Sequence, residues 1–125
     1  MEGYKVTIKE VSRNLTARER IMFKDTSNAV KLDEALKDGG NLIITPADYA
    51  VLNIYNEKAD DKEYENYIIM DTAGTKYVTG SPSFWSAFME IADEMKGEDE
   101  EWSIEVYKMD SKNYKGKQFL TCSIV

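Results

Sequence analysis

The spacing of apolar residues predicts a chain made mainly of strands. Side chains along a strand point alternately to its two faces, so an apolar–polar period of two is typical of a strand with one buried face. Residues 18–25 show this alternation, with Ile21 and Phe23 on one side, and residues 27–35 give a further short run. Residues 4–11 and 49–56 alternate in the same way, and further strands are predicted over 64–71, 102–109 and 117–125.

Turn residues separate these predicted strands. Pro46 interrupts the apolar run that begins at Asn41, which indicates two elements rather than one. The sequence "KDGGN" before that run is a plain turn signal. The sequence "TAGT", residues 72–75, is a tight turn followed by "KYV", which predicts a hairpin with the strand over 64–71.

One segment has the period of a helix. Ser81 before Pro82 is a typical helix start, and Gly97 is a typical helix end. Between them, apolar residues at spacings of three and four form a single stripe. The stripe consists of Phe84, Trp85, Phe88, Ile91, Ala92 and Met95. We expect one α-helix over about residues 82–96, before the last two strands.

The order of these elements favours a mainly β fold. From residue 49 onward the chain reads as three strands, one helix and two strands, close to the five-stranded OB-fold barrel. The extra N-terminal strands would extend this OB-fold-like barrel or pack beside it. A β-sandwich with one helix is the alternative. A length of 125 residues is typical of one domain, so we expect a single nucleic-acid-binding domain over residues 1–125.

Charge is distributed unevenly along the chain. Residues 1–24 carry six basic and three acidic side chains, a net charge of +3. Residues 25–103 carry six basic and eighteen acidic ones, a net of −12, and residues 104–125 carry four and two, a net of +2. These values add to the net charge of −7. If the two basic ends lie side by side, they form a basic face that can attract a polyanion.

Most catalytic and metal-binding chemistry lacks its residues here. The sequence has no histidine, and its one cysteine, Cys122, has no histidine to activate it. No phosphate-binding loop is present, and the acidic clusters lack the spacing of a calcium loop. We therefore expect no enzyme activity, no cofactor and no metal. A single cysteine suggests a reducing compartment, and the absence of an 18-residue apolar run argues against a membrane span.

Aromatic residues interleaved with basic ones are the positive signal. Proteins that bind single strands stack bases on aromatic rings and follow the phosphates with Lys and Arg. The lysine-rich stretch between the last two strands is expected to bind nucleic acid. The candidate nucleic-acid-binding residues are Lys5, Lys9, Arg18, Arg20, Lys24, Tyr55, Tyr67, Tyr107, Lys108, Lys112, Tyr114, Lys115 and Lys117.

Three stretches resemble small proteins of tailed phages and prophages of Gram-positive bacteria. They are "FKDTSNAVKLDE", "NEKADDKEYENYIIMDTAGTKYVTGSPSFWSAFMEI" and "SKNYKGKQFLTCSIV". The order of their elements is similar to that of the single-stranded-DNA-binding proteins of such phages, which are OB-folds. The resemblance implies cooperative coating of single-stranded DNA during phage DNA replication or recombination, in the host bacterial cytoplasm, with replication or recombination proteins as partners. Many such binders end in an acidic tail, whereas this sequence ends in apolar "TCSIV".

Two other functions stay open. The net charge of −12 over residues 25–103 would suit an acidic protein-interaction module, such as a DNA-mimicking inhibitor of a host enzyme. A small strand-rich domain would also suit a structural protein of the virion. An exposed strand edge at Ile124 and Val125 would favour pairing into a homodimer.

Overall fold

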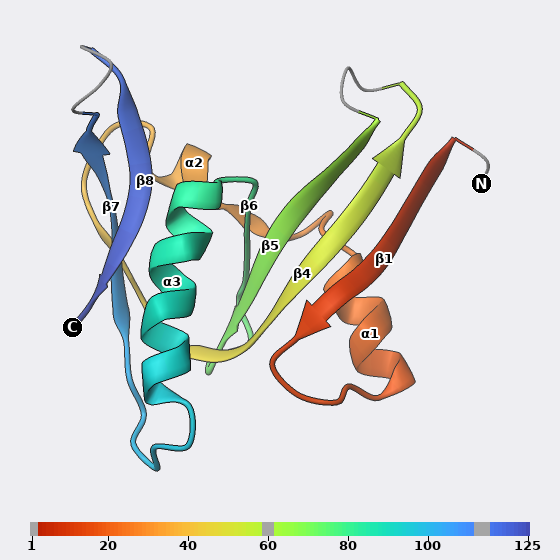
Figure 1. Cartoon of the computed structure of the whole chain (residues 1–125), viewed down its shortest axis with the longest axis horizontal. Coiled ribbons are helices and arrows are strands. Elements are labelled where there is room, and N and C mark those ends of the chain that lie inside the picture. The colour runs from red at the N-terminus through yellow and green to blue at the C-terminus, as the bar shows by residue number, and fades with distance from the viewer. Residues whose placement is uncertain (1–2, 59–61, 112–115) are drawn as a thin grey trace. The chain divides into compact units, whose positions relative to one another are not determined.

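A computed structural model describes residues 3–58, 62–111 and 116–125 (Figure 1). Two compact units are formed, each from two segments of the chain. The first consists of Met1–Lys31 and Ala47–Gly80, and the second of Leu32–Pro46 and Ser81–Val125. The expected single domain over residues 1–125 stays a prediction.

The first unit is built on a five-stranded sheet in the order β1-β4-β5-β6-β2. Strand β1 pairs with β4 and β5 pairs with β6, both antiparallel, whereas the two-residue β2 lies parallel to β6. A bulge between Ile8 and Glu10 interrupts the β1–β4 register. The strands are β1 (Tyr4–Val11), β2 (Val30–Lys31), β4 (Pro46–Asn56), β5 (Glu63–Asp71) and β6 (Lys76–Thr79).

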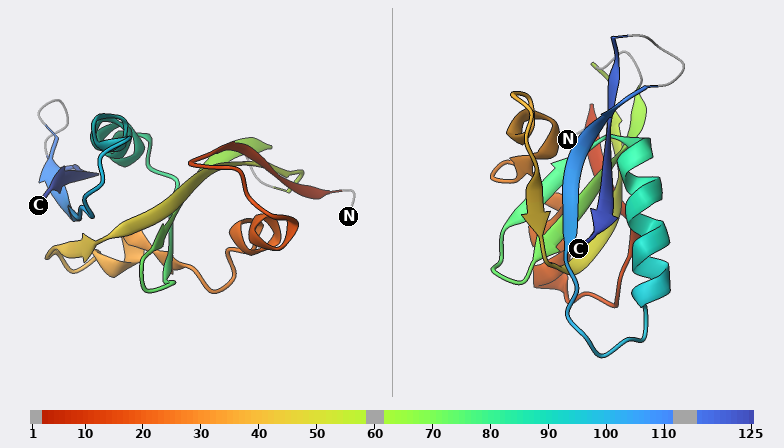
Figure 2. Two further views of the ribbon diagram at one scale, coloured as in Figure 1. Left: turned by 90° about the horizontal axis from the view of Figure 1, so that it is seen from below. Right: turned by 90° about the vertical axis from the view of Figure 1, so that its left-hand side faces the viewer.

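Helix α1 (Ala17–Lys24) covers one face of this sheet (Figure 2). Its one buried residue, Phe23, belongs to a core formed with residues that alternate along the central strands. Alternation therefore gives the sheet one apolar face against α1 and leaves the polar residues of β1 on the other. The core residues from the strands are Ala50, Leu52, Ile54, Ile68 and Val78.

The strand predicted over residues 18–25 is wrong, because this segment is helix α1. The helix begins with a capping box. The Thr16 hydroxyl accepts a hydrogen bond from the Glu19 amide at 3.2 Å, and the Glu19 carboxylate accepts one from the Thr16 amide at 2.9 Å. Both bonds satisfy amide groups that a helix start leaves unpaired, so "TARE" is a helix-start signal that outweighs the short alternation after it.

Replacing Thr16 with alanine is expected to destabilise the protein by about 1 kcal/mol, the usual cost of losing such a cap. Urea unfolding followed by circular dichroism measures this change. Thr72→Ala is the matched control, because Thr72 is exposed in the β5–β6 turn and a change there is expected to stay within about 0.5 kcal/mol. Equal stability of the two variants would contradict the role of the cap.

The second unit has a three-stranded antiparallel sheet in the order β3-β7-β8, with helix α3 packed along β8 (Figure 2). Its elements are α2 (Leu32–Ala35), β3 (Leu42–Ile44), α3 (Pro82–Met95), β7 (Ile104–Asp110) and β8 (Gln118–Ile124). The predicted helix over 82–96 is confirmed. The Ser81 hydroxyl caps it by accepting from the Phe84 amide at 3.2 Å, and Gly97 follows it with a positive φ of 89°.

Aromatic rings form the centre of this second unit. The ring of Phe88 has its centroid 5.0 Å from Trp85, 6.1 Å from Phe84 and 6.0 Å from Trp102. Phe84 and Phe88 have no exposed surface. On the sheet, the buried residues are Ile44, Ile104, Val106, Leu120 and Cys122.

The remaining strand predictions are largely confirmed. Strand β1 matches the predicted range 4–11, and β4, β5 and the last two strands contain most of theirs. Pro46 separates β3 from β4, and β5 and β6 form the predicted hairpin. The run over 27–35 is wrong in part, because only Val30–Lys31 is a strand and α2 follows at once.

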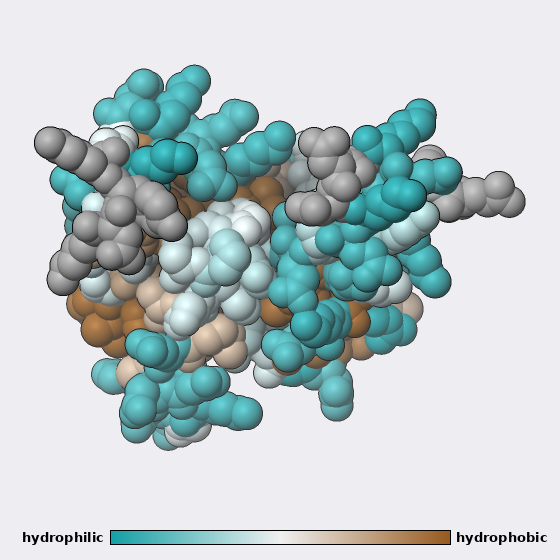
Figure 3. Space-filling view, turned by 45° about the horizontal axis from the view of Figure 1, so that its top comes forward, coloured by the Kyte–Doolittle hydropathy of each residue, from teal (hydrophilic) through white to brown (hydrophobic). Residues whose placement is uncertain are grey.

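The predicted fold class is confirmed only as mainly β. In the described residues no closed barrel is found, so the OB-fold is not confirmed, and three helices replace the single predicted one. The N-terminal strand and the last two strands lie in different sheets, so they do not form one hydrogen-bonded basic face. Hydrophilic side chains cover much of the face shown in Figure 3, with hydrophobic surface between them. No helix within the described ranges is long and apolar enough to cross a membrane.

Candidate nucleic-acid interface

The outer face of the β3-β7-β8 sheet is an open surface of apolar and aromatic residues. Its inner face is buried, and alternation places the residues between the buried ones on the other side. Three of these large apolar residues are well exposed: Ile43 (53%), Met109 (45%) and Phe119 (36%). We define the outer face as Ile43, Glu105, Tyr107, Met109, Phe119, Thr121 and Ser123.

The register of β7 and β8 places the rings of Tyr107 and Phe119 on the same face. Met109 lies opposite Phe119, and Tyr107 lies opposite Thr121, so Tyr107 and Phe119 are diagonal neighbours. Such neighbours are about 7–8 Å apart, within reach of aromatic side chains. The Tyr107 hydroxyl is 2.6 Å from the Ser123 hydroxyl, a hydrogen bond that directs the half-buried ring toward Ser123, the diagonal neighbour on the side away from Phe119.

Among the described residues, one predicted basic site residue, Lys117, lies at the hairpin end of the outer face. Lys117 is exposed just before β8, and its carbonyl accepts a hydrogen bond from the Ser111 amide at 2.8 Å. Lys108 is half-buried and lies opposite Leu120, on the inner side of the sheet rather than on the outer face. Three further predicted site residues, Lys112, Tyr114 and Lys115, lie outside the described residues.

A second group of predicted residues lies on the sheet face of the first unit that is turned away from α1. Lys5 is exposed and faces the half-buried Tyr55 across the β1–β4 pair. Lys9 donates a hydrogen bond to the Glu65 carboxylate at 2.5 Å, and the Tyr67 hydroxyl donates to the same carboxylate at 3.3 Å. Four predicted residues therefore lie on this face as two pairs. Lys5 faces Tyr55 in the β1–β4 register, and Lys9 and Tyr67 both bond Glu65.

The negative charge of the Glu65 carboxylate weakens the attraction of this second group for phosphate. Its hydrogen bond raises the pKa of Lys9, and the same bond lowers the pKa of Glu65, so both groups are charged at neutral pH and offset each other. Tyr67 is only 8% exposed, which leaves little ring surface for a base, and burial raises its pKa. Lys5 with Tyr55 is what remains there for a nucleic acid.

The three basic residues predicted over 18–25 lie on α1 instead of a strand. Arg18, Arg20 and Lys24 are all exposed, and Arg20 donates to the Leu15 carbonyl at 2.7 Å. Because α1 packs on the apolar face of its sheet, these residues do not share a face with Lys5 and Tyr55.

Arg13 links α1 to β4. Its guanidinium bonds both Glu19, at the first turn of α1, and Asp48 on β4. The hydrogen bond from Arg13 lowers the pKa of Glu19 to about 2, with the Thr16 amide as the next cause. The helix that carries Arg18, Arg20 and Lys24 is therefore tied to the sheet by charge as well as by Phe23.

Sequence reasoning missed Ile43, Met109 and Phe119. Phe119 alternates with Leu120 and Cys122, so the period of two could have placed it on the face of Tyr107. Cys122, in contrast, is buried, and burial raises the pKa of its thiol to about 12, which suits a core residue. Over the described ranges, no group of three or more Cys, Asp or Glu residues could hold a metal ion.

Comparison with known proteins gives no relative. No protein-family model, no curated protein and no solved structure matches the chain. The resemblance to phage single-stranded-DNA-binding proteins therefore stays a prediction.

Proposed function

We propose that the chain binds single-stranded DNA, without sequence preference, on the outer face of the β3-β7-β8 sheet. The observation that carries the proposal is the diagonal pair Tyr107 and Phe119 on an exposed sheet face that ends at a lysine-rich hairpin. The lysines of the hairpin are Lys112, Lys115 and Lys117.

In this proposal, aromatic rings bind the bases and lysines bind the phosphates. Successive bases stack on Tyr107 and Phe119, and Met109 and Ile43 extend the apolar surface beside them. Stacking uses the flat face of any base, which explains tolerance of sequence. Lys117 and the lysines before it supply positive charge for the phosphates, while Glu105 marks the far end of the face from the hairpin.

The chain as a whole is acidic, and this limits where a polyanion can bind. A net charge of −7 repels DNA from most of the surface, whereas residues 104–125 carry +2. The resemblance to phage proteins agrees with this function and would set it in phage DNA replication or recombination in the host bacterial cytoplasm. Catalysis forms no part of the proposal.

Titration with an unstructured thymidine oligonucleotide tests the function. We expect quenching of the tyrosine and tryptophan fluorescence and saturable binding at low salt. Each lysine that neutralises a phosphate contributes about −0.7 to the slope of log affinity against log salt, so two or three lysines predict a slope of about −1.4 to −2.1. Lys112→Glu with Lys115→Glu should weaken binding strongly and flatten the slope.

A charge-matched variant controls for the loss of positive charge. Lys58→Glu with Lys62→Glu makes the same change of charge on the β4–β5 connection of the first unit, and it should weaken binding much less. Equal losses in both double variants would show attraction by overall charge alone. Absence of any binding at low salt would overturn the proposed function.

A further inference from the structure

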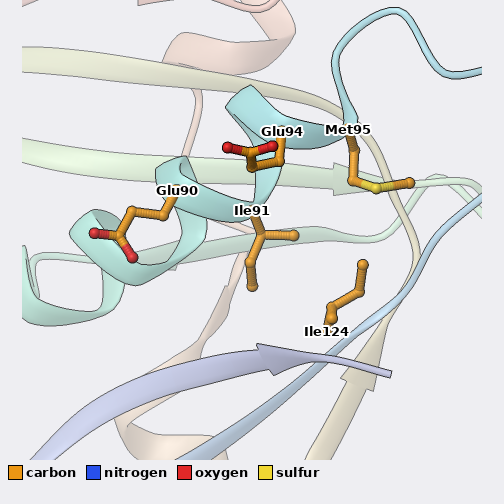
Figure 4. A pocket seen from close by; sticks show the side chains of 5 residues that line it. All are labelled: Glu90, Ile91, Glu94, Met95 and Ile124. Carbon is orange, nitrogen blue, oxygen red and sulfur yellow. The ribbon is translucent and has the colours of Figure 1, made fainter.

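A small apolar pocket lies between α3 and the end of β8 (Figure 4). Its volume is about 230 Å³, and Ile91, Met95 and Ile124 line it with hydrocarbon and sulfur. Ile124 is 50% exposed, which is unusual for an isoleucine beside a helix that buries Phe88 and Ala92. Burying such a side chain would be favourable.

Two carboxylates stand at the rim of the pocket. Glu90 and Glu94 are one turn apart on α3, both are exposed, and Figure 4 shows them beside the apolar side chains. Within the part of the chain that the structure describes, no ion pair neutralises either carboxylate. Residues 81–101 carry seven acidic side chains and one basic one, Lys96, a net charge of −6. The surroundings of the pocket therefore attract cations.

We propose that this pocket binds a segment of a partner protein in which an apolar side chain stands next to Lys or Arg. The apolar side chain would fill the space between Ile91, Met95 and Ile124, and the basic residue would pair with Glu90 or Glu94. Charge complementarity selects this occupant, because a nucleic acid or an acidic segment would be repelled. The volume is below the roughly 300–1,000 Å³ of sites for drug-sized ligands, which suits a side chain.

This function goes beyond DNA binding and uses the opposite side of the sheet. Ile124 follows Ser123 on β8, so it points away from the outer face and toward α3. A partner in the pocket would leave Tyr107 and Phe119 accessible. The second unit could then hold single-stranded DNA on one side and a basic protein on the other.

Selection from a phage-displayed library of random twelve-residue peptides on the immobilised full chain tests the proposal. We expect selected peptides to place an apolar residue beside Lys or Arg. Synthetic copies should bind at least ten times more weakly to Glu90→Lys with Glu94→Lys, and to Ile124→Ser, than to the wild type. Glu98→Lys with Glu100→Lys makes the same charge change in the following loop and should cost less than about threefold.

A measurement on the wild type keeps the test independent of folding in the variants. With ¹³C-labelled methyl groups, the selected peptide should shift the signals of Ile91, Met95 and Ile124 and leave Ile43, on the outer face, unchanged. Failure to select any peptide would overturn the proposal. So would peptides that bind the rim variants as well as the wild type, or that still bind after their apolar residue is replaced by serine. None of these outcomes depends on whether the chain binds DNA.

Discussion

The double variant Tyr107→Ala with Phe119→Ala is expected to bind an oligothymidylate at least about 30-fold more weakly than the wild type. Each base stacked on an aromatic ring contributes about 1–3 kcal/mol, so loss of two rings costs about 2 kcal/mol at the least. Of the two single variants, Tyr107→Ala should lose more affinity, because the hydrogen bond to Ser123 holds the Tyr107 ring in place before a base binds. Fluorescence anisotropy of a labelled oligonucleotide measures the affinities of both single variants and of the double variant.

Tyr4→Ala is a suitable control for this loss of aromatic surface. Tyr4 is 39% exposed, close to the 36% of Phe119, but it lies on β1 in the first unit. Its removal should change the affinity less than about twofold, and circular dichroism should show that all variants keep their strands. If the double variant binds like the wild type, bases do not stack on the outer face. The Lys5 and Tyr55 pair would then be the next surface to test.

Local signals were sufficient for the elements whose ends and period agree. Helix α3 has a six-residue apolar stripe between the Ser81 cap and Gly97, and the structure places its ends within a residue of the expected range. The β5–β6 hairpin follows from a strand, a four-residue turn and another strand. In these segments the turn, the cap and the hydrophobic pattern all favour the same structure, so sequence alone was enough.

Helix α1 shows why a short alternation misleads. Eight residues fit either period almost equally well, since only Phe23 becomes buried. The deciding information lay just before the segment, in the reciprocal bonds of Thr16 and Glu19. The cap determines this helix more than its own pattern does.

Strand pairing was beyond what the alternation could determine. A period of two shows that one side of a strand is buried, but not which strand lies beside it. A basic face required the two basic ends of the chain to lie side by side, but β1 pairs with β4 and β8 with β7. The ion pair of Lys9 with Glu65 was also hidden, because those residues are 56 positions apart and meet only through the sheet.

The candidate site was predictable in part for the same reason. Tyr107 was placed on the side opposite Ile104 and Val106, and the structure confirms that both of these are buried. The side of Tyr67 could not be decided from its neighbours Glu65 and Ile69, and the structure shows that this residue is buried. Exposure of Ile43 depends on β3 being the edge strand of the β3-β7-β8 sheet, which no local pattern reveals.

Phe88 should be the residue on which the second unit depends most. It has no exposed surface, and the rings of Phe84, Trp85 and Trp102 lie around it. Truncation to alanine would remove the ring that these three contact and leave a cavity, because the α3 backbone is fixed by its cap and by its packing on β8.

Phe88→Ala is therefore expected to lower the free energy of unfolding by about 3–5 kcal/mol, out of the roughly 5–15 kcal/mol of a typical domain. Urea unfolding followed by the fluorescence of Trp85 and Trp102 reports on the same cluster. Glu90→Ala, an exposed change two residues along α3, should cost less than about 0.5 kcal/mol. A loss below 1 kcal/mol for Phe88→Ala would mean that the aromatic cluster is not a packed core. The outer face would then lack the rigid support that stacking on Tyr107 and Phe119 requires.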